Sequence, residues 1–136
     1  MADYLFDSSF LIDYFNEVAD ATVGPARRFR GQMPARSRLF VSIASLAELL
    51  EGANDPAAVE RELGLLARPL GLSQQHARRV GMIQRRARDN GTRLGENDAW
   101  IAATAALAQL KLVGDDDRAF ANRPAVSYVN FRTSKP

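Results

Sequence analysis

Tyr4-Leu5-Phe6-Asp7-Ser8-Ser9 lies near the start of the chain and carries its clearest fold signal. Three apolar residues followed by an acid and two serines predict a short buried strand that ends in a turn. Either Ser8 or Ser9 can cap a helix that continues through residues 10–15. A strand that leads directly into a helix predicts a βα unit, from which parallel sheets are built.

The same pattern recurs further along the chain. Leu39-Phe40-Val41 precedes a predicted helix over 42–52 that Ser42 caps, and Leu112-Val113 precedes Gly114-Asp115-Asp116-Asp117. The other predicted elements are helices over 25–30, 56–67, 73–90, 98–107 (capped by Asn97) and 118–120, and strands over 69–70 and 125–131. This alternation predicts a single α/β domain over 1–136, with a mostly parallel central sheet, helices on both faces and a frayed polar tail.

Composition excludes several kinds of chemistry. The chain has no Cys and one His, which excludes a thiol nucleophile, a disulfide scaffold and a zinc–thiolate site. Any metal would therefore have to be held by oxygen ligands. All 18 basic residues except Lys111 and Lys135 are Arg, a side chain whose planar fork suits phosphate groups. Nucleic acid is one partner that this favours, although a GC-rich genome also enriches Arg.

The location of the protein is predicted to be cytoplasmic. No apolar run approaches the ~18–20 residues of a membrane span. The N-terminal residues carry Asp3 and Asp7 and no basic leader, which argues against a secretory signal.

Acidic residues occur where ligands bind in parallel sheets. Asp7 and the run 115–117 follow predicted strands, Asp98 lies in the first turn of an apolar helix, and Glu48 lies within a helix. If these segments converge, several carboxylates share one site and need a divalent cation such as Mg²⁺ as counter-charge. Taken singly, each acid also has a simpler interpretation as a helix cap, a solvated helix face or a turn.

Four segments together resemble the motifs of PIN domains. They are Tyr4–Ile12, Ser42–Leu49 with Glu48, Asn97–Ala105 with Asp98, and Leu112–Phe120, in the family's order and over nearly the whole chain. In size and motifs the chain most resembles VapC, the toxin of VapBC toxin–antitoxin pairs.

The resemblance implies a Mg²⁺- or Mn²⁺-dependent endoribonuclease that cleaves tRNA or another structured RNA. Asp7, Glu48, Asp98 and Asp116 would be its catalytic and metal-binding acids. Asp7 and Asp98 would bind the ion directly, and Glu48 and Asp116 would hold a second ion or its water. Ser8 would support the metal or the substrate phosphate. A VapB-like antitoxin, lying in a groove near the acids, and a homodimer are the implied partners.

One position departs from the family pattern. The usual Thr of the fourth motif is Gly114 here, so a supporting hydroxyl is missing. The register is less clear as a result, and Asp117 is an alternative to Asp116 as the fourth acid. Asp116 is preferred because it lies two residues after the Thr-equivalent position.

Two groups of arginines flank the motifs, over residues 27–38 and 78–93. They are predicted either to contact RNA phosphates or to form a solvated surface. Two other functions stay open: a catalytically inactive PIN-like RNA-binding or scaffold module, and a phosphotransfer domain of similar topology. The latter usually needs a Lys after a late strand, but Lys135 lies in the tail.

Overall fold

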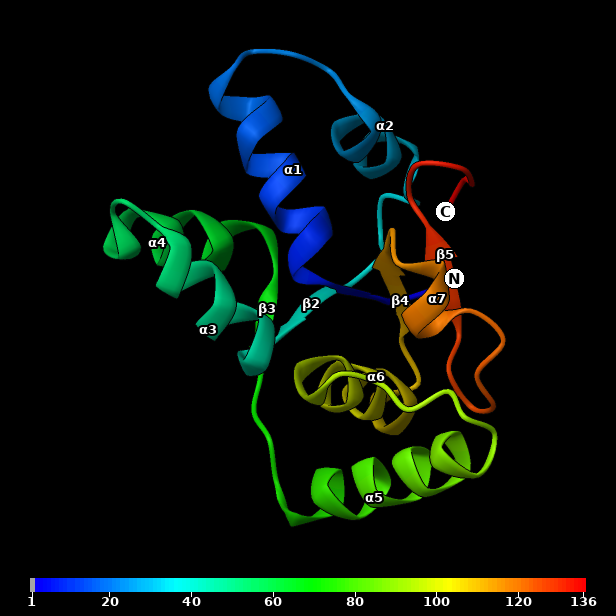
Figure 1. Ribbon diagram of the computed structural model, residues 1–136. Coiled ribbons are helices and arrows are strands. Elements are labelled where there is room, and N and C mark those ends of the chain that lie inside the picture. The colour runs from blue at the N-terminus through cyan, green and yellow to red at the C-terminus, as the bar shows by residue number, and fades with distance from the viewer. Residues whose placement is uncertain (1) are drawn as a thin grey trace.

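The computed structural model describes residues 2–136 and consists of one sheet with helices on both faces (Figure 1). All five strands are parallel, in the order β3-β2-β1-β4-β5. The strands are β1 (Tyr4–Phe6), β2 (Leu39–Ser42), β3 (Arg68–Leu70), β4 (Lys111–Gly114) and β5 (Tyr128–Asn130). The helices are α1 (Ser8–Ala19), α2 (Pro25–Gln32), α3 (Ile43–Gly52), α4 (Pro56–Leu66), α5 (Gln74–Asp89), α6 (Glu96–Ala108) and α7 (Asp117–Phe120). The predicted α/β class and the helices on both faces are confirmed, and the sheet is parallel throughout.

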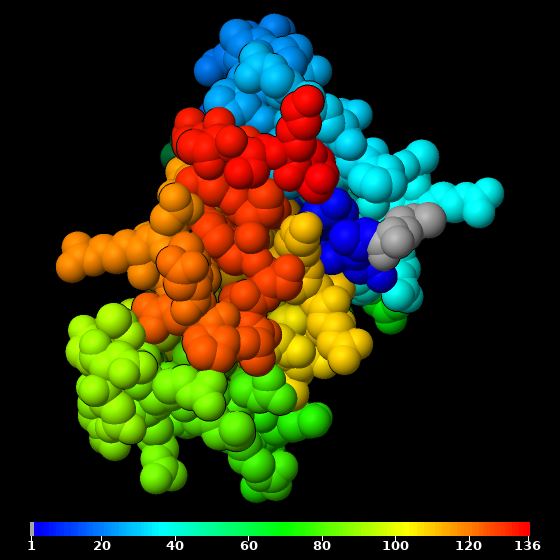
Figure 2. Space-filling view, turned by 90° about the vertical axis from the view of Figure 1, so that its right-hand side faces the viewer, coloured from blue at the N-terminus to red at the C-terminus, as the bar shows by residue number. Residues whose placement is uncertain are grey.

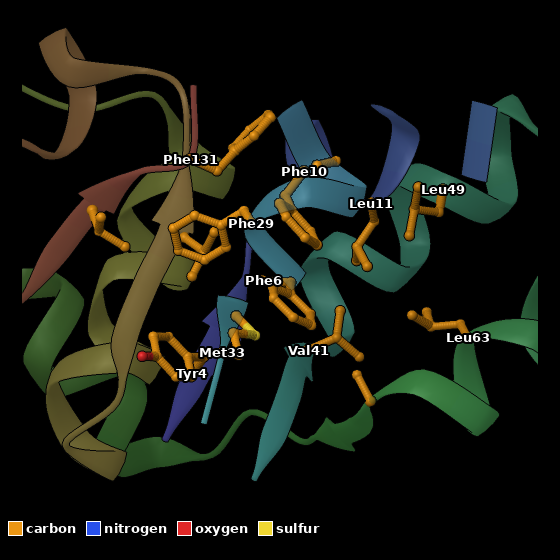
Figure 3. Packing of buried hydrophobic residues seen from close by; sticks show 14 residues of the cluster. Tyr4, Phe6, Phe10, Leu11, Phe29, Met33, Val41, Leu49, Leu63 and Phe131 are labelled. Atoms are coloured by element: carbon orange, nitrogen blue, oxygen red, sulfur yellow. The ribbon is translucent and has the colours of Figure 1, made fainter. Parts of the chain in front are cut away.

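An aromatic core lies between the sheet and helices α1–α4. Tyr4 and Phe6 point to this face because side chains alternate along a strand. Phe10 of α1 stacks on Phe6 with ring centroids 4.4 Å apart, and Phe29 and Phe131 meet Phe10 edge-on (Figure 3). This packing fixes the first turn of α1, which begins immediately after Asp7.

The opposite face is covered by α6, and α5 packs on the outside of α6. Leu5 points to this side, where it joins Leu112, Phe120 and the small residues of α6. The α6 side chains Ala99 and Ile101–Ala105 are all buried, as expected for a helix that is apolar nearly all round. Asp98 therefore lies at the start of a helix held firmly between two layers.

The chain order creates a switch point between β1 and β4. From β1 the chain builds β2 and β3 on one side, and then returns to place β4 on the other side of β1. In open parallel sheets a crevice forms at the carboxyl ends of strands at such a point. Asp7 follows β1 and the acidic run 115–117 follows β4, so the switch point is where these residues meet.

Three local predictions were wrong. The N-cap of α1 is Asp7 and not a serine, and the N-cap of α6 is Gly95 and not Asn97. Strand β5 spans only Tyr128–Asn130, because Ala125 adopts a positive φ of 64° that ends the extended backbone. Beyond β5, the amides of Thr133 and Ser134 donate to the carbonyl of Asn130 and form a turn.

Candidate acidic site at the switch point

Asp7 is the most buried carboxylate of the predicted site. Its residue is only 6% exposed, and Ser9 Oγ donates to its Oδ2 at 3.2 Å. Burial raises the pKa of Asp7 to about 6, and the negative charges of Asp98 and Glu48 contribute to this rise. The β1–α1 junction therefore holds a carboxylate in an environment that disfavours its charge.

Four acids from four segments influence one another at this end of the sheet. We call Asp7, Glu48, Asp98 and Asp116 the acidic cluster. The pKa of Asp98 is raised, first by burial and then by the charges of Asp116 and Glu48. The four predicted residues thus lie near enough for their charges to interact, although no three of them are close enough to hold a metal ion within residues 2–136.

Ser8 and Gly114 show how closely these segments approach. Ser8 Oγ lies 3.4 Å from Glu48 Oε2, which links the start of α1 to α3. A Cβ at Gly114 would lie 3.3 Å from both Cβ and Oδ2 of Asp7, and 3.7 Å from Ser9 Oγ. A threonine there would crowd Asp7, and the hydroxyl that reaches Asp7 comes from Ser9 instead.

The three consecutive aspartates have different partners. Asp117 accepts hydrogen bonds from Tyr128 Oη at 2.7 Å and Asn130 Nδ2 at 3.0 Å, and these bonds lower its pKa. Asp115 accepts from Arg132 Nε at 3.0 Å. Asp116 caps α7 through Oδ1, which accepts from the amide of Ala119 at 3.0 Å. Of the three, Asp116 is the one whose charge raises the pKa of Asp98.

Sequence reasoning missed the supporting role of the last strand. Tyr128, Asn130 and Arg132 alternate along the chain and bind the two aspartates on either side of Asp116. Arg132 also bridges to Asp13 of α1, so one side chain connects the β4–α7 and β1–α1 segments. The signal was present as polar residues at alternate positions of a strand, but a strand pattern does not reveal which residues its polar side contacts.

The oxygen donors of the cluster fit a hard divalent cation. None of the four acids forms an ion pair within residues 2–136. In the same residues, no three acidic or histidine side chains lie close enough together to hold a metal ion. Four carboxylates without a counter-charge repel one another when all are ionised. Mg²⁺ and Mn²⁺ prefer oxygen ligands, and Mg²⁺ keeps several waters, so such a cation would remove this repulsion.

These features define a doubly wound α/β protein whose acidic cluster lies at the switch point of a parallel sheet. The PIN domain family model matches residues 4–126, and the chain belongs to this family. No curated protein sequence gives a significant match. Within residues 2–136, no helix has the length and apolar character needed to cross a membrane.

Solved structures of toxin–antitoxin complexes share the fold. A chain of Rickettsia felis VapBC2, bound to a promoter DNA fragment, is 18% identical with a TM-score of 0.76, and the match covers 93% of this chain and 97% of that one. DNA-bound VapBC from Salmonella typhimurium gives 25% identity and a TM-score of 0.71, covering 96% and 99%. A chain of a Klebsiella pneumoniae toxin–antitoxin complex is 24% identical with a TM-score of 0.73, and the match covers 98% of this chain and 100% of that one. The resemblance to PIN domains of the VapC type is confirmed.

Proposed function

We propose that the protein is a metal-dependent endoribonuclease toxin of the VapC type. The observation that carries this proposal is the buried Asp7 carboxylate, raised in pKa by burial and by two neighbouring acids and lacking any cationic partner within residues 2–136. Burying Asp7 beside other acids does not stabilise the fold, but a bound cation would neutralise these charges and make the cluster a metal site.

Asp7 and Asp98 would hold a Mg²⁺ ion, for which Mn²⁺ can be exchanged in the assay, and Glu48 and Asp116 would hold a second ion or its water. A bound divalent ion supplies an activated water and stabilises charge on a phosphoryl group. Ser9 keeps Asp7 oriented through the 3.2 Å hydrogen bond, and Ser8 does the same for Glu48. The cluster contains no Cys and no His, so its carboxylates are the side chains that would accept and donate protons during cleavage.

The proposed substrate is RNA, with tRNA as the first candidate class, in the cytoplasm. The test is cleavage of labelled total tRNA by the purified chain in the presence of Mg²⁺. We expect EDTA and the double variant Asp7→Asn, Asp98→Asn each to lower the cleavage rate by about 10³-fold, equal to ~4 kcal/mol of barrier. Asp3→Asn is the matched control, because Asp3 lies at the opposite end of β1 and should keep the wild-type rate. Unchanged cleavage by the double variant would refute the proposal.

A cognate VapB-like antitoxin is the proposed protein partner. An open cavity of about 380 Å³ lies between α1 and α4, lined by Tyr14, Phe15, Val18, Arg30, Glu62, Leu65 and Leu66. Leu65 is 91% exposed and Val18 is 44% exposed, which leaves apolar surface for an amphipathic helix. Leu65→Glu should abolish co-purification with the antitoxin while leaving RNA cleavage intact. By the same resemblance we expect a homodimer, which sedimentation velocity measures.

An inactive PIN-like module is the second candidate. The wide spacing of the acids, with no three of them at ligand distance within residues 2–136, favours it. Calorimetric titration with Mn²⁺ separates the two functions. A saturable binding isotherm that Asp7→Asn removes supports the nuclease, whereas no binding at millimolar Mn²⁺ supports the inactive module.

A further inference from the structure

A cavity of about 410 Å³ lies away from the acidic cluster, between α5 and the segment 122–125. Its apolar floor is formed by Met82, Ile83 and Ala87, and Met82 is 65% exposed. Arg79, Arg86, Asn90, Thr92, Asn122, Arg123, Pro124 and Ala125 complete its lining. Figure 2 shows the orange segment around residues 122–125 lying directly against the green surface of α5. We call this feature the α5 groove.

The α5 groove is built on the segments that carry two of the acids. Thr92 lies in the short connection that leads to α6 and Asp98, and Asn122 follows α7 and Asp116. Arg123 joins these segments, because its Nη1 donates to the Thr92 carbonyl at 2.7 Å and its Nε to the Ala119 carbonyl at 2.7 Å. A ligand in the groove therefore has a fixed position relative to the acidic cluster.

The charge of the groove is positive and lacks internal partners. Helix α5 carries Arg78, Arg79, Arg85, Arg86 and Arg88, and none of them forms an ion pair within residues 2–136. Of these, Arg79 and Arg86 line the groove, and Arg123 has Nη2 left for a ligand. Guanidinium groups beside an apolar floor match a molecule that has both an apolar face and anionic groups.

A strained turn shapes the other wall. The amide of Val126 donates to the carbonyl of Arg123 at 3.2 Å, with Pro124 and Ala125 at the turn's centre. Ala125 has φ 64°, a conformation that a type II turn usually assigns to Gly or Asn. Strain of this kind persists only where the surrounding structure holds it, and it fixes the segment opposite α5.

We propose that the α5 groove binds one unpaired nucleotide of the RNA substrate together with its flanking phosphates. The base would lie on the floor at Met82 and Ile83, the amides of Asn90 and Asn122 would face its edge, and Arg79 and Arg86 would contact phosphates. An acidic peptide without aromatic residues would satisfy the arginines but offers no flat apolar face for the floor, whereas every RNA nucleotide carries both a flat base and a phosphate. This inference rests on the proposed ribonuclease function and names how its substrate is held.

Binding can be measured without cleavage. The probe is a labelled single-stranded RNA of about ten nucleotides, followed by fluorescence anisotropy in EDTA. We expect Arg79→Ala, Arg86→Ala to weaken binding about tenfold. Loss of two phosphate contacts should also make the negative slope of log K against the logarithm of salt concentration less steep by about 1.4. The matched control is Arg78→Ala, Arg85→Ala, which removes the same charge from the same helix outside the groove and should have a much smaller effect.

Two further measurements, and one outcome of the arginine experiment, keep the proposal falsifiable. Met82→Ser should weaken RNA binding but leave binding of an abasic oligonucleotide unchanged, which tests the base contact. Equal losses for the two arginine pairs would show only general charge attraction and would overturn the groove. A glutamate-rich peptide that competes at the same concentration as RNA would overturn the choice of ligand. None of these binding measurements depends on catalysis. The ribonuclease proposal is tested separately, by the cleavage activity of the Asp7 variants.

Discussion

Asp3 and Asp7 lie at the two ends of strand β1 and have opposite environments. Asp3 accepts hydrogen bonds from the amide, Nε and Nη2 of Arg38 at 2.9, 3.0 and 2.7 Å, and these contacts lower its pKa. Asp7 is 6% exposed, has other acids as its charged neighbours, and its pKa rises to about 6. The same side chain is thus matched by a cation at one end of the strand and left unmatched at the other.

The difference separates an acid that supports the fold from the acid that we propose to be functional. Asp3 and Arg38 join the start of β1 to the start of β2, so their contact supports the sheet. Asp7 offers no such benefit, because burying a carboxylate among like charges opposes folding. A chain under selection for stability alone would place Asn or an apolar residue at the end of β1.

The largest expected effect is on the pH dependence of stability. Burial raises the pKa of Asp7 from 3.8 to about 6, so between these values the folded chain binds a proton that the unfolded chain has lost. Wild-type stability in EDTA should therefore fall as the pH rises from about 4 to about 6, by on the order of 3 kcal/mol. Asp7→Asn should lose the Asp7 contribution to this fall, keep only what the raised pKa of Asp98 contributes, and be more stable than wild type at neutral pH. Urea denaturation across this range measures it.

Asp3→Asn is the comparison variant for that experiment. The pKa of Asp3 is lowered in the folded chain, so its contribution is present above the usual aspartate range and is lost as the pH falls. The two variants should thus change the pH profile in opposite directions. Identical profiles for both would mean that the two ends of β1 do not differ as described.

The second effect is stabilisation by a divalent cation. At a concentration 100 times its Kd, Mn²⁺ should raise the free energy of unfolding by about 2.7 kcal/mol. Asp7→Asn should lose most of this gain, since Asp7 is a proposed ligand, while Asp3→Asn should keep it. Thermal denaturation with and without Mn²⁺ measures the shift, and an equal gain in the Asp7 and Asp3 variants would exclude the acidic cluster as the binding site.

Much of this comparison could be anticipated from the sequence. Buried strands such as Leu112–Val113 stand out as short apolar runs, and the acids that follow these runs already indicate where the switch point lies. Helix α6 was identifiable because its own sequence carries small apolar residues on nearly every face. The preference for Asp116 among the three aspartates came from the resemblance, which places it two residues after the Thr-equivalent Gly114, and the charge of Asp116 raises the pKa of Asp98.

The remaining features depend on contacts between distant residues. Nothing local in the sequence indicates that Arg132 reaches Asp115 and Asp13, because those contacts form only when β5 adds to the edge of the sheet. The α5 groove was equally hidden, since Ala125 gives no sign of a positive φ in a position where Gly or Asn is usual. Packing, rather than local preference, decides both features.

A third effect tests how the acidic run is oriented. Arg132 holds Asp115 as Arg38 holds Asp3, and its bridge to Asp13 requires two separated guanidinium nitrogens. Arg132→Lys keeps the charge but cannot bind both acids in this way. We expect it to weaken Mn²⁺ binding about tenfold by loosening the loop around Asp116. Calorimetric titration measures this.

Arg118→Lys is the matched control for Arg132→Lys, because it makes the same substitution at another arginine. Arg118 is exposed on α7, immediately after the acidic run, and forms no ion pair within residues 2–136. Its replacement should leave Mn²⁺ affinity near the wild-type value. If both variants weaken binding equally, the effect of Arg132→Lys does not depend on the contacts of Arg132 with Asp115 and Asp13.

The smallest effect is expected from Arg38→Ala. This change frees Asp3, whose contact with Arg38 is largely exposed to solvent, and exposed ion pairs contribute little to stability. The slight loss should be seen at neutral pH and vanish as the pH falls through the Asp3 pKa, because a protonated Asp3 no longer attracts Arg38. Mn²⁺ affinity should stay unchanged, since Arg38 binds Asp3 at the amino-terminal end of β1, opposite to the acidic cluster. If Arg38→Ala weakened Mn²⁺ binding as much as Arg132→Lys, the two ends of β1 would be coupled. Asp3 would then influence the acidic cluster and would no longer be a purely structural acid.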